Sequence, residues 1–435
     1  MISLFGLIGA LALLIYLTIR GMNLLIAAPL TAIIIALTGD LSLLPYGEES
    51  NNFIHSYMSG FAGFISSWFF MFLLGALFGK LMEDSGCADS LAQWIVSKLG
   101  MNNAALAVIA VCAILTYGGV SVFVVAFSAY SIALSLFKQA NLPRRFIPAV
   151  MAFGSVTFTM TSAGSPEIQN WIPIKYLGTS PYAGWEVSLV VAVFMALFGY
   201  WWLQRMMSKA IANGEHFHVR DTDPIASEKT LPNPIVAALP ILAVLTVTFL
   251  GHEAFAQYAL ILALLSGCLT AWLLNIRLFS NLNMTIGAGT AGALLAIGNT
   301  AAVVGFGSVA KVSPAFAIAV DYLTAMPGNE LVGAAVAVSV IAAMTGSASG
   351  GQSIALPALA PHYIDAGVDP EALHRVIAIS SGALDSLPHN GYVVTTIRSI
   401  CGETHQAAYA PMAALTVVVP LIGTAMAVLL FLSTG

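Results

Sequence analysis

The chain has 435 residues, of which 59% are hydrophobic and only 8% are charged, and its formal net charge is −5. Soluble domains are about a quarter charged, so this composition excludes a soluble globular protein, and so small a net charge does not indicate a nucleic-acid partner. The four cysteines are scattered without CxxC spacing, so they favour buried apolar positions over a disulfide framework or a metal site.

Apolar runs long enough to cross a hydrocarbon core of about 30 Å recur along the chain. The N-terminus lacks a basic region and a small-residue cleavage site, so the first run predicts a retained helix and not a signal peptide. The expected fold class is therefore an all-α polytopic membrane protein. The clearest runs are residues 2–17, 23–38, 187–202, 234–250, 256–274 and 408–432.

A polar segment, residues 205–233, divides the chain nearly in half and predicts a cytoplasmic linker between two membrane bundles. Landmarks then recur in the same order on its two sides. Lys80 and Lys311 lie 231 residues apart, and Gly118 and Gly350 lie 232 residues apart. We infer an internal duplication, with an N-terminal repeat over residues 1–204 and a C-terminal repeat over residues 234–435.

Each repeat is expected to contain about five transmembrane helices and one re-entrant hairpin, at about residues 103–137 and 331–366. Five crossings are an odd number, so the two repeats must be inverted relative to each other. With both termini outside, the other Lys and Arg residues lie inside and only Lys175, Lys311 and Arg375 lie outside. This arrangement obeys the positive-inside rule.

Four polar stretches interrupt the apolar helices, at residues 116–121, 159–170, 345–353 and 382–391. In hydrocarbon such breaks survive only when they are buried in protein or line a cavity. Matched interruptions in two inverted halves point to a transporter site near the midplane, and free N–H groups at half-helix N-termini suit a carboxylate. The candidate substrate-binding residues are Tyr117, Gly118, Gly119, Ser121, Thr161, Ser162, Ser165, Asn170, Ser347, Ser349, Gly350, Gly351, Gln352, Ser353 and Asn390.

The two glycine pairs also fit close helix packing. For Gly118 and Gly119 packing and binding are equally good interpretations. For the second pair the matched break and the polar neighbours favour a binding site. These neighbours are Ser347, Ser349, Gln352 and Ser353.

Asp385 and His389 lie four residues apart, so a continuous helix would place them on one face, although Pro388 predicts that the helix is broken. They could form a structural pair, a proton relay or part of a metal site. Ionisable residues in membranes are costly and usually functional, and two residues do not make a metal site. We favour a structural or proton-coupling role and expect no metal or cofactor. Glu167 is the other proton-coupling candidate, unless it lies at the outer surface beside Lys175.

The stretch at residues 73–95, "LLGALFGKLMEDSGCADSLAQWI", resembles the gluconate permease (GntP) family of the ion-transporter superfamily. The resemblance continues through "YGGVSVFV", "TGSASGGQSIALPAL" and "GALDSLPHNGYVVTTIRSICGETHQAAY". It implies proton-coupled uptake of small hydroxy monocarboxylates by a dimeric protein that moves as an elevator. The breaks "TSAGSPEIQN" and "LDSLPHNG" depart from the pattern of sugar-acid members and are similar to the 3-hydroxybutyrate and short-chain hydroxy-acid variant.

We therefore expect a non-enzymatic, proton-coupled symporter in the inner (cytoplasmic) membrane that imports a small organic monoanion such as gluconate or 3-hydroxybutyrate. Its expected partners are the substrate anion, a proton, the lipid bilayer and a second copy in a homodimer. The close alternative is a carboxylate symporter that is coupled to Na⁺ and not to protons. A passive channel would need an open polar path, and an intramembrane enzyme would need more catalytic groups than Asp385 and His389.

Overall fold

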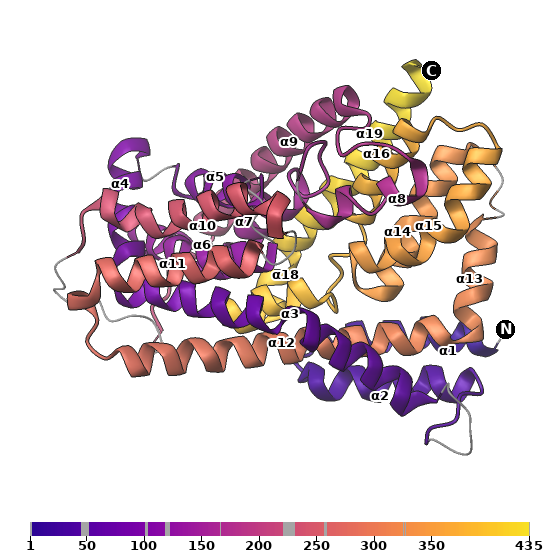
Figure 1. Ribbon diagram of the computed structural model, residues 1–435, viewed down its shortest axis with the longest axis horizontal. Helices are drawn as coiled ribbons and strands as arrows, with labels where there is room; N and C mark the ends of the chain where they lie inside the picture. Colours follow the sequence, from indigo (N-terminus) through magenta and orange to yellow (C-terminus); the bar gives the residue numbers. More distant parts are fainter. Residues whose placement is uncertain are drawn as a thin grey trace.

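The computed structural model describes residues 2–44, 52–100, 103–117, 122–165, 167–220, 231–255, 259–324, 326 and 328–434. Apart from one isolated bridge between Ser42 and Asn52, the regular elements of these residues are all helices (Figure 1). The expected all-α fold is therefore confirmed. The longer helices in chain order are α1 (Ile2–Ile19), α2 (Leu24–Thr38), α3 (Phe53–Asp84), α4 (Cys87–Leu99), α5 (Ala104–Tyr117), α6 (Val122–Gln139), α7 (Ile147–Ala152), α9 (Trp185–Ala212), α10 (Pro234–Phe255), α11 (Ala259–Leu274), α12 (Leu282–Val312), α13 (Pro314–Thr324), α14 (Glu330–Thr345), α15 (Ala348–Asp365), α16 (Pro370–Ser381), α18 (His405–Ala413) and α19 (Val419–Thr434).

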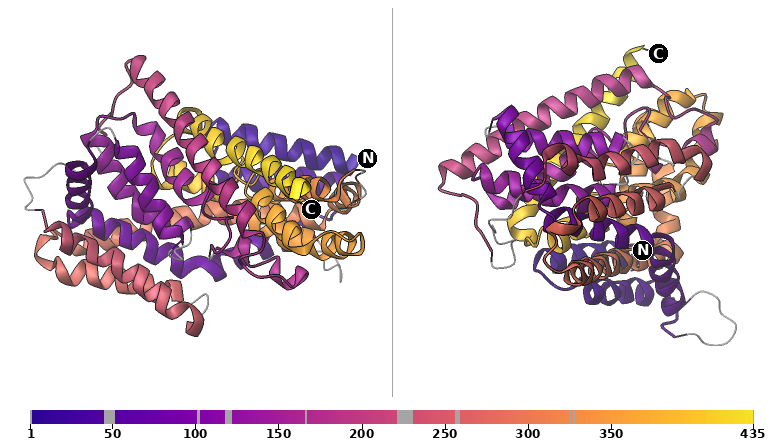
Figure 2. Two further views of the ribbon diagram at one scale, coloured as in Figure 1. Left: turned by 90° about the horizontal axis from the view of Figure 1, so that it is seen from above. Right: turned by 60° about the vertical axis from the view of Figure 1, so that its left-hand side comes forward.

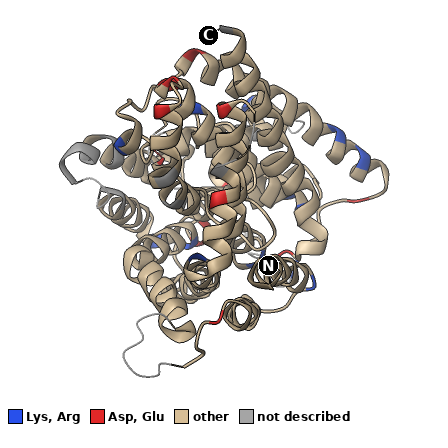
Figure 3. Cartoon of the chain, turned by 90° about the vertical axis from the view of Figure 1, so that its right-hand side faces the viewer, with Lys and Arg blue, Asp and Glu red and all other residues tan. Residues whose placement is uncertain are grey.

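Several of these helices are long and apolar enough to cross a membrane. Within the described ranges there are five such helices, or six if the bent pair α14–α15 is one span. Charged residues are sparse along the ribbon (Figure 3). The chain is a multi-pass membrane protein, whereas the inverted repeat and the sidedness of the termini stay predictions. The five helices are α1, α3, α9, α12 and the continuous segment His405–Ser433.

The two longest helices, α3 with 32 residues and α12 with 31, lie side by side (Figures 1 and 2). Glycine lets their backbones come close, because a Cβ on Gly289 would lie 3.1 Å from the Cα of Leu77. In addition, α12 packs against α2, and α13 packs against α1. Helices from the two halves of the sequence are thus interleaved and do not form two separate bundles.

The hairpin expected at residues 331–366 corresponds to α14 and α15, which are bent by 119° at a short break. Gly346 ends α14 with a left-handed φ of +61°, a conformation that glycine adopts without strain. Gly351 lets the two arms touch, because a Cβ there would lie 2.7 Å from the Cα of Ala342. In the first half, α5 and α6 pack together as the arms of the other expected hairpin, but their connection lies outside the described residues.

Both expected helix breaks are present. After α7 the chain makes a π-helical turn over Phe153–Thr157 and then bends through residues 158–173, which we call the first break. After α16 ends at Ser381, residues 382–390 form the second break, and helix resumes in α17 (Gly391–Val394). Asn390 caps this restart, since its Oδ1 accepts from the backbone N–H of Val393 at 3.0 Å. The second break therefore has a defined end.

The segment at residues 205–233 is not wholly a linker in structure. α9 continues through its first eight residues to Ala212. Beyond this helix the chain is anchored, because Arg145 donates to both carboxylate oxygens of Glu215 at 2.6 and 2.9 Å. These hydrogen bonds lower the pKa of Glu215 below its usual range. Arg220 then reaches the second half and donates to the Gly402 carbonyl and to Glu403, each at 2.6 Å.

The close contact at Gly351 gives a first prediction. The Gly351→Ala substitution should lower the melting temperature of the detergent-solubilised protein, because an added methyl group between packed backbones costs about 1–3 kcal/mol. The matched control is Gly63→Ala in α3, where a Cβ meets no atom within 4 Å. That variant should melt at or slightly above the wild-type temperature. Equal melting of the two variants would contradict the close packing of α14 on α15.

Candidate functional site

A cavity of about 450 Å³ lies where both breaks meet α3, α6, α12 and the end of α14. Its lining combines polar side chains with aromatic and aliphatic ones. We call residues 345–350, where α14 gives way to α15, the α14–α15 tip. The polar lining includes Ser347, Ser349, Gly350, Ser353, Asp385 and Asn390, and the apolar lining includes Phe64, Trp68, Val122, Phe123, Val156, Met160, Ile168 and Ile172.

The α14–α15 tip presents a helix N-terminus to the cavity. Ser347 is the N-cap of α15, and its Oγ accepts from the backbone N–H of Gly350 at 3.1 Å. The Asp385 carboxylate faces the backbone N–H of Ala348, the first residue of α15. It also accepts from the Ser386 hydroxyl at 3.0 Å. A carboxylate at this position is favoured by the free N–H groups and the positive end of the helix dipole.

The second break holds this tip in place. Nε2 of His389 lies 3.1 Å from the carbonyl oxygen of Ala343. Asn390 donates from Nδ2 to the Gly346 carbonyl at 2.8 Å. His389 is fully buried, does not line the cavity and is not paired with Asp385. Of the three interpretations, the structural pair is not formed, because residues 382–390 are not helical, as Pro388 predicted. Asp385 lies at the cavity, whereas His389 lies behind the tip.

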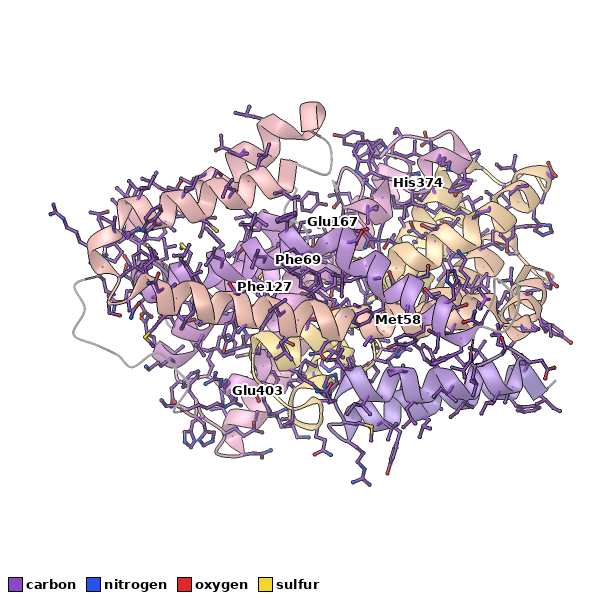
Figure 4. The ribbon with its side chains drawn as sticks, turned by 60° about the horizontal axis from the view of Figure 1, so that its bottom comes forward. Met58, Phe69, Phe127, Glu167, His374 and Glu403 are labelled. Carbon is purple, nitrogen blue, oxygen red and sulfur yellow. The ribbon has the colours of Figure 1, made fainter. Side chains whose placement is uncertain are left out.

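Glu167, from the first break, is the second carboxylate of the cavity. It is 8% exposed and lines the cavity, and its carboxylate faces the backbone N–H of Val122, the first residue of α6. Figure 4 shows it near the middle of the molecule, away from Glu403. Among the described residues its Oε1 has no hydrogen-bond partner, and neither has Oε1 of Gln169 beside it. Each break thus places one carboxylate at the start of a hairpin arm.

A buried arginine holds the first break against the second half. Arg375 of α16 is fully buried and donates to the carbonyls of Ala183 at 2.9 Å and Thr161 at 2.8 Å. It also donates to Asn170 Oδ1 at 2.9 Å and to the Pro181 carbonyl at 3.2 Å. Carbonyl dipoles thus surround the guanidinium, whose rigid fork of donors suits several acceptors at once. The result is a fixed path for the segment that carries Glu167.

Gln352 makes a second connection between the halves. Its Nε2 donates to the Gln169 carbonyl at 3.0 Å and to the Ser381 hydroxyl at 2.9 Å. It therefore joins α15, the first break and the end of α16 behind the cavity lining. This places Gln352 in the support of the site, although the sequence suggested direct contact with substrate.

The predicted site residues fall into four groups. Ser347, Ser349, Gly350, Ser353, Asn390, Asp385 and Glu167 line the cavity. Thr161, Ser165, Asn170, Gly351, Gln352 and His389 are buried beside it without lining it. Tyr117 and Ser162 line a separate pocket of about 200 Å³ next to Tyr182 and Trp185. Gly118, Gly119 and Ser121 lie outside the described residues.

Sequence reasoning missed the walls contributed by α3 and α12. Phe64 and Trp68 are one helical turn apart on α3 and face the cavity. On α12, Val304, Ser308 and Lys311 face it at spacings of four and three residues. The only signal in the sequence was the match of Lys80 to Lys311 in the repeat, which marks a position and not a role. Over the described ranges, no group of three or more His, Cys, Asp or Glu could hold a metal ion.

No protein-family model matches the chain, so the resemblance to the gluconate permease family stays a prediction. The chain is 34% identical to the uncharacterized transporter YxjC of Bacillus subtilis (strain 168) over an alignment of 453 residues that covers 94% of both chains. Among solved structures it is similar to the YdaH transporter of Alcanivorax borkumensis, with 15% identity and a TM-score of 0.43 over 100% of this chain and 99% of that one. That likeness is too distant to establish a shared fold.

The Arg375 contacts give a second prediction. The Arg375→Gln variant leaves several buried carbonyls without donors, at a cost of about 1–3 kcal/mol for each unsatisfied group, so its melting temperature should fall sharply. Arg375→Lys should recover only part of the loss because lysine lacks the planar fork. Arg277→Gln, at an exposed position, serves as the control and should melt like the wild type. A Lys variant as stable as the wild type would show that charge alone, and not the fork, is required.

Proposed function

The chain belongs to the family of transporters that includes YxjC of Bacillus subtilis, and on this premise we propose that it is a proton-coupled symporter of small organic monocarboxylates. Membrane transport follows from membership of this family. Because the relative is a transporter, the comparison is also consistent with a non-enzymatic protein. The substrate class, the coupling ion and the residues involved are our proposal. The elevator movement and the homodimer belong to it through the resemblance to the gluconate permease family alone.

The observation that carries the proposal is the pair of carboxylates at helix starts in one cavity. Asp385 faces the first N–H of α15, and Glu167 faces the first N–H of α6. A substrate carboxylate would seek the same N–H groups. When the substrate carboxylate binds one of these N–H groups, the displaced acidic side chain remains beside a second anion. Two neighbouring negative charges are costly in a site removed from water. A proton on the displaced side chain removes the conflict, so anion and proton enter together.

The walls of the cavity favour one kind of monocarboxylate. A volume of about 450 Å³ lies within the range of small-molecule sites. The lining includes Phe64, Val156 and Ile172, whose side chains form no hydrogen bonds with hydroxyl groups, whereas Trp68 has a single N–H donor. Every hydroxyl of a sugar acid that is buried there without a partner would cost about 1–3 kcal/mol. The cavity therefore favours a short-chain hydroxy acid such as 3-hydroxybutyrate over gluconate.

Coupling to Na⁺ is the second candidate, and one observation supports it. The Oε1 atoms of Glu167 and Gln169 are both buried at the cavity and lack donors among the described residues. Carboxylate and amide oxygens are typical ligands of hard cations. A sodium ion held there would offset the substrate charge in the same way as a proton.

Transport by purified protein in liposomes tests the proposal. Radiolabelled 3-hydroxybutyrate should accumulate when the outside is acidic, a protonophore should abolish the accumulation, and an inward Na⁺ gradient should not restore it. Gluconate in excess should compete poorly. Accumulation that follows the Na⁺ gradient and ignores the protonophore would replace the proton version by the Na⁺ version. Equilibration without accumulation under either gradient would show a passive channel.

The role of Asp385 gives a third prediction. Asp385→Asn imitates the protonated side chain permanently, so this variant should still exchange labelled for unlabelled substrate but should lose all accumulation driven by a pH gradient. Asp365→Asn, at the exposed end of α15, removes the same charge away from the cavity and should keep both activities. Full pH-driven accumulation by Asp385→Asn would remove this carboxylate from coupling and leave Glu167 as the candidate.

A further inference from the structure

Lys311 is a basic residue in the lining of the cavity, and neither the family nor the sequence assigned it a role. It lies in the last turn of α12, one turn after Gly307 and Ser308, which also line the cavity. Its side chain is exposed, whereas the deeper positions of the same face, such as Val303, are buried. The ammonium group therefore stands where the cavity opens to its surroundings.

The contrast with Lys80, its counterpart in the sequence repeat, shows that Lys311 is unusual. Nζ of Lys80 lies 2.6 Å from Oε1 of Glu83 and 3.1 Å from Oδ1 of Asp84, so its charge is balanced locally. Lys311 forms no ion pair or hydrogen bond with any residue in the described part of the chain. A lysine that forms no ion pair with a described acidic residue, at the opening of a cavity, can bind an incoming anion.

A lysine at this position can also be accounted for without a ligand. A cation in the last turn of a helix interacts favourably with the helix dipole, and a lysine near a helix end can extend its charge to the water interface. Both effects make lysine tolerable at position 311. Neither depends on the cavity, so they predict that loss of the charge affects stability slightly and substrate binding not at all.

We propose that the ammonium group of Lys311 binds the carboxylate of the incoming substrate and so makes the site selective for anions over neutral molecules of the same shape. The inference rests on the proposed function, since it needs a monocarboxylate as substrate. The two acidic side chains of the cavity alone would repel such an anion. Lys311 offsets that repulsion at the opening and raises the local concentration of anions there, an effect that salt screens.

Binding to the purified full chain tests the proposal, with 3-hydroxybutyrate as the anionic probe and 3-hydroxybutyramide as its neutral counterpart. Lys311→Gln should bind the acid at least about tenfold more weakly, with a smaller dependence on salt, while its affinity for the amide is unchanged. Lys311→Arg should retain most of the preference for the acid. Lys175→Gln, which removes an exposed cation of α8 (Ile174–Leu177) away from the cavity, is the control and should match the wild type.

A labelling experiment gives an independent readout. All four native cysteines are buried, so Lys311→Cys adds a thiol that an anionic thiosulfonate reagent should modify while the wild type stays unlabelled. Bound 3-hydroxybutyrate should slow this modification. Equal acid affinity in Lys311→Gln and the wild type, or labelling unaffected by substrate, would overturn the role of Lys311 and leave the transporter proposal standing. A wild type that binds and transports no monocarboxylate would overturn both.

Discussion

The candidate site depends on one buried charge, the guanidinium of Arg375. A positive group without water must be surrounded by acceptors, and here these are carbonyls and the Asn170 amide of a segment more than 190 residues away in sequence. These four hydrogen bonds connect Thr161, Asn170, Pro181 and Ala183 to α16. Glu167 lies between Thr161 and Asn170, so an arginine that does not itself line the cavity holds the chain on both sides of this carboxylate.

The cavity is consequently a property of the whole chain. Gln352 connects the first break to α15, while Asn390 and His389 connect the second break to the end of α14. Polar contacts of this kind stabilise non-helical backbone within the hydrocarbon region of a membrane, because lipid offers no partner for a free carbonyl or N–H group. Aromatic side chains of α3 close the other side. The cavity thus combines polar and apolar lining in one small space.

The sequence was sufficient to predict where the helices are interrupted, because clusters of glycine, proline and polar residues seldom occur within an unbroken membrane helix. It predicted Asp385, Glu167 and the serines around Gly350 at the cavity, and the structure places them there. It could not separate them from Asn170, Gln352 and His389, which have similar chemistry but are directed into supporting contacts. That distinction depends on partners far away in the chain. Lys311 and the α3 aromatics were missed because each sits in an unbroken helix, where only the packing of α3 on α12 decides which face meets the cavity.

The contacts of Glu215 and Arg220 connect the two halves of the chain. Glu215 is bound to Arg145 of the first half, and five residues later Arg220 is bound to Gly402 and Glu403 of the second half. The crossing from one half to the other is thus held by side chains before the polypeptide reaches α10. The two halves are therefore joined here by side-chain hydrogen bonds as well as by the chain that runs on from Arg220 to α10.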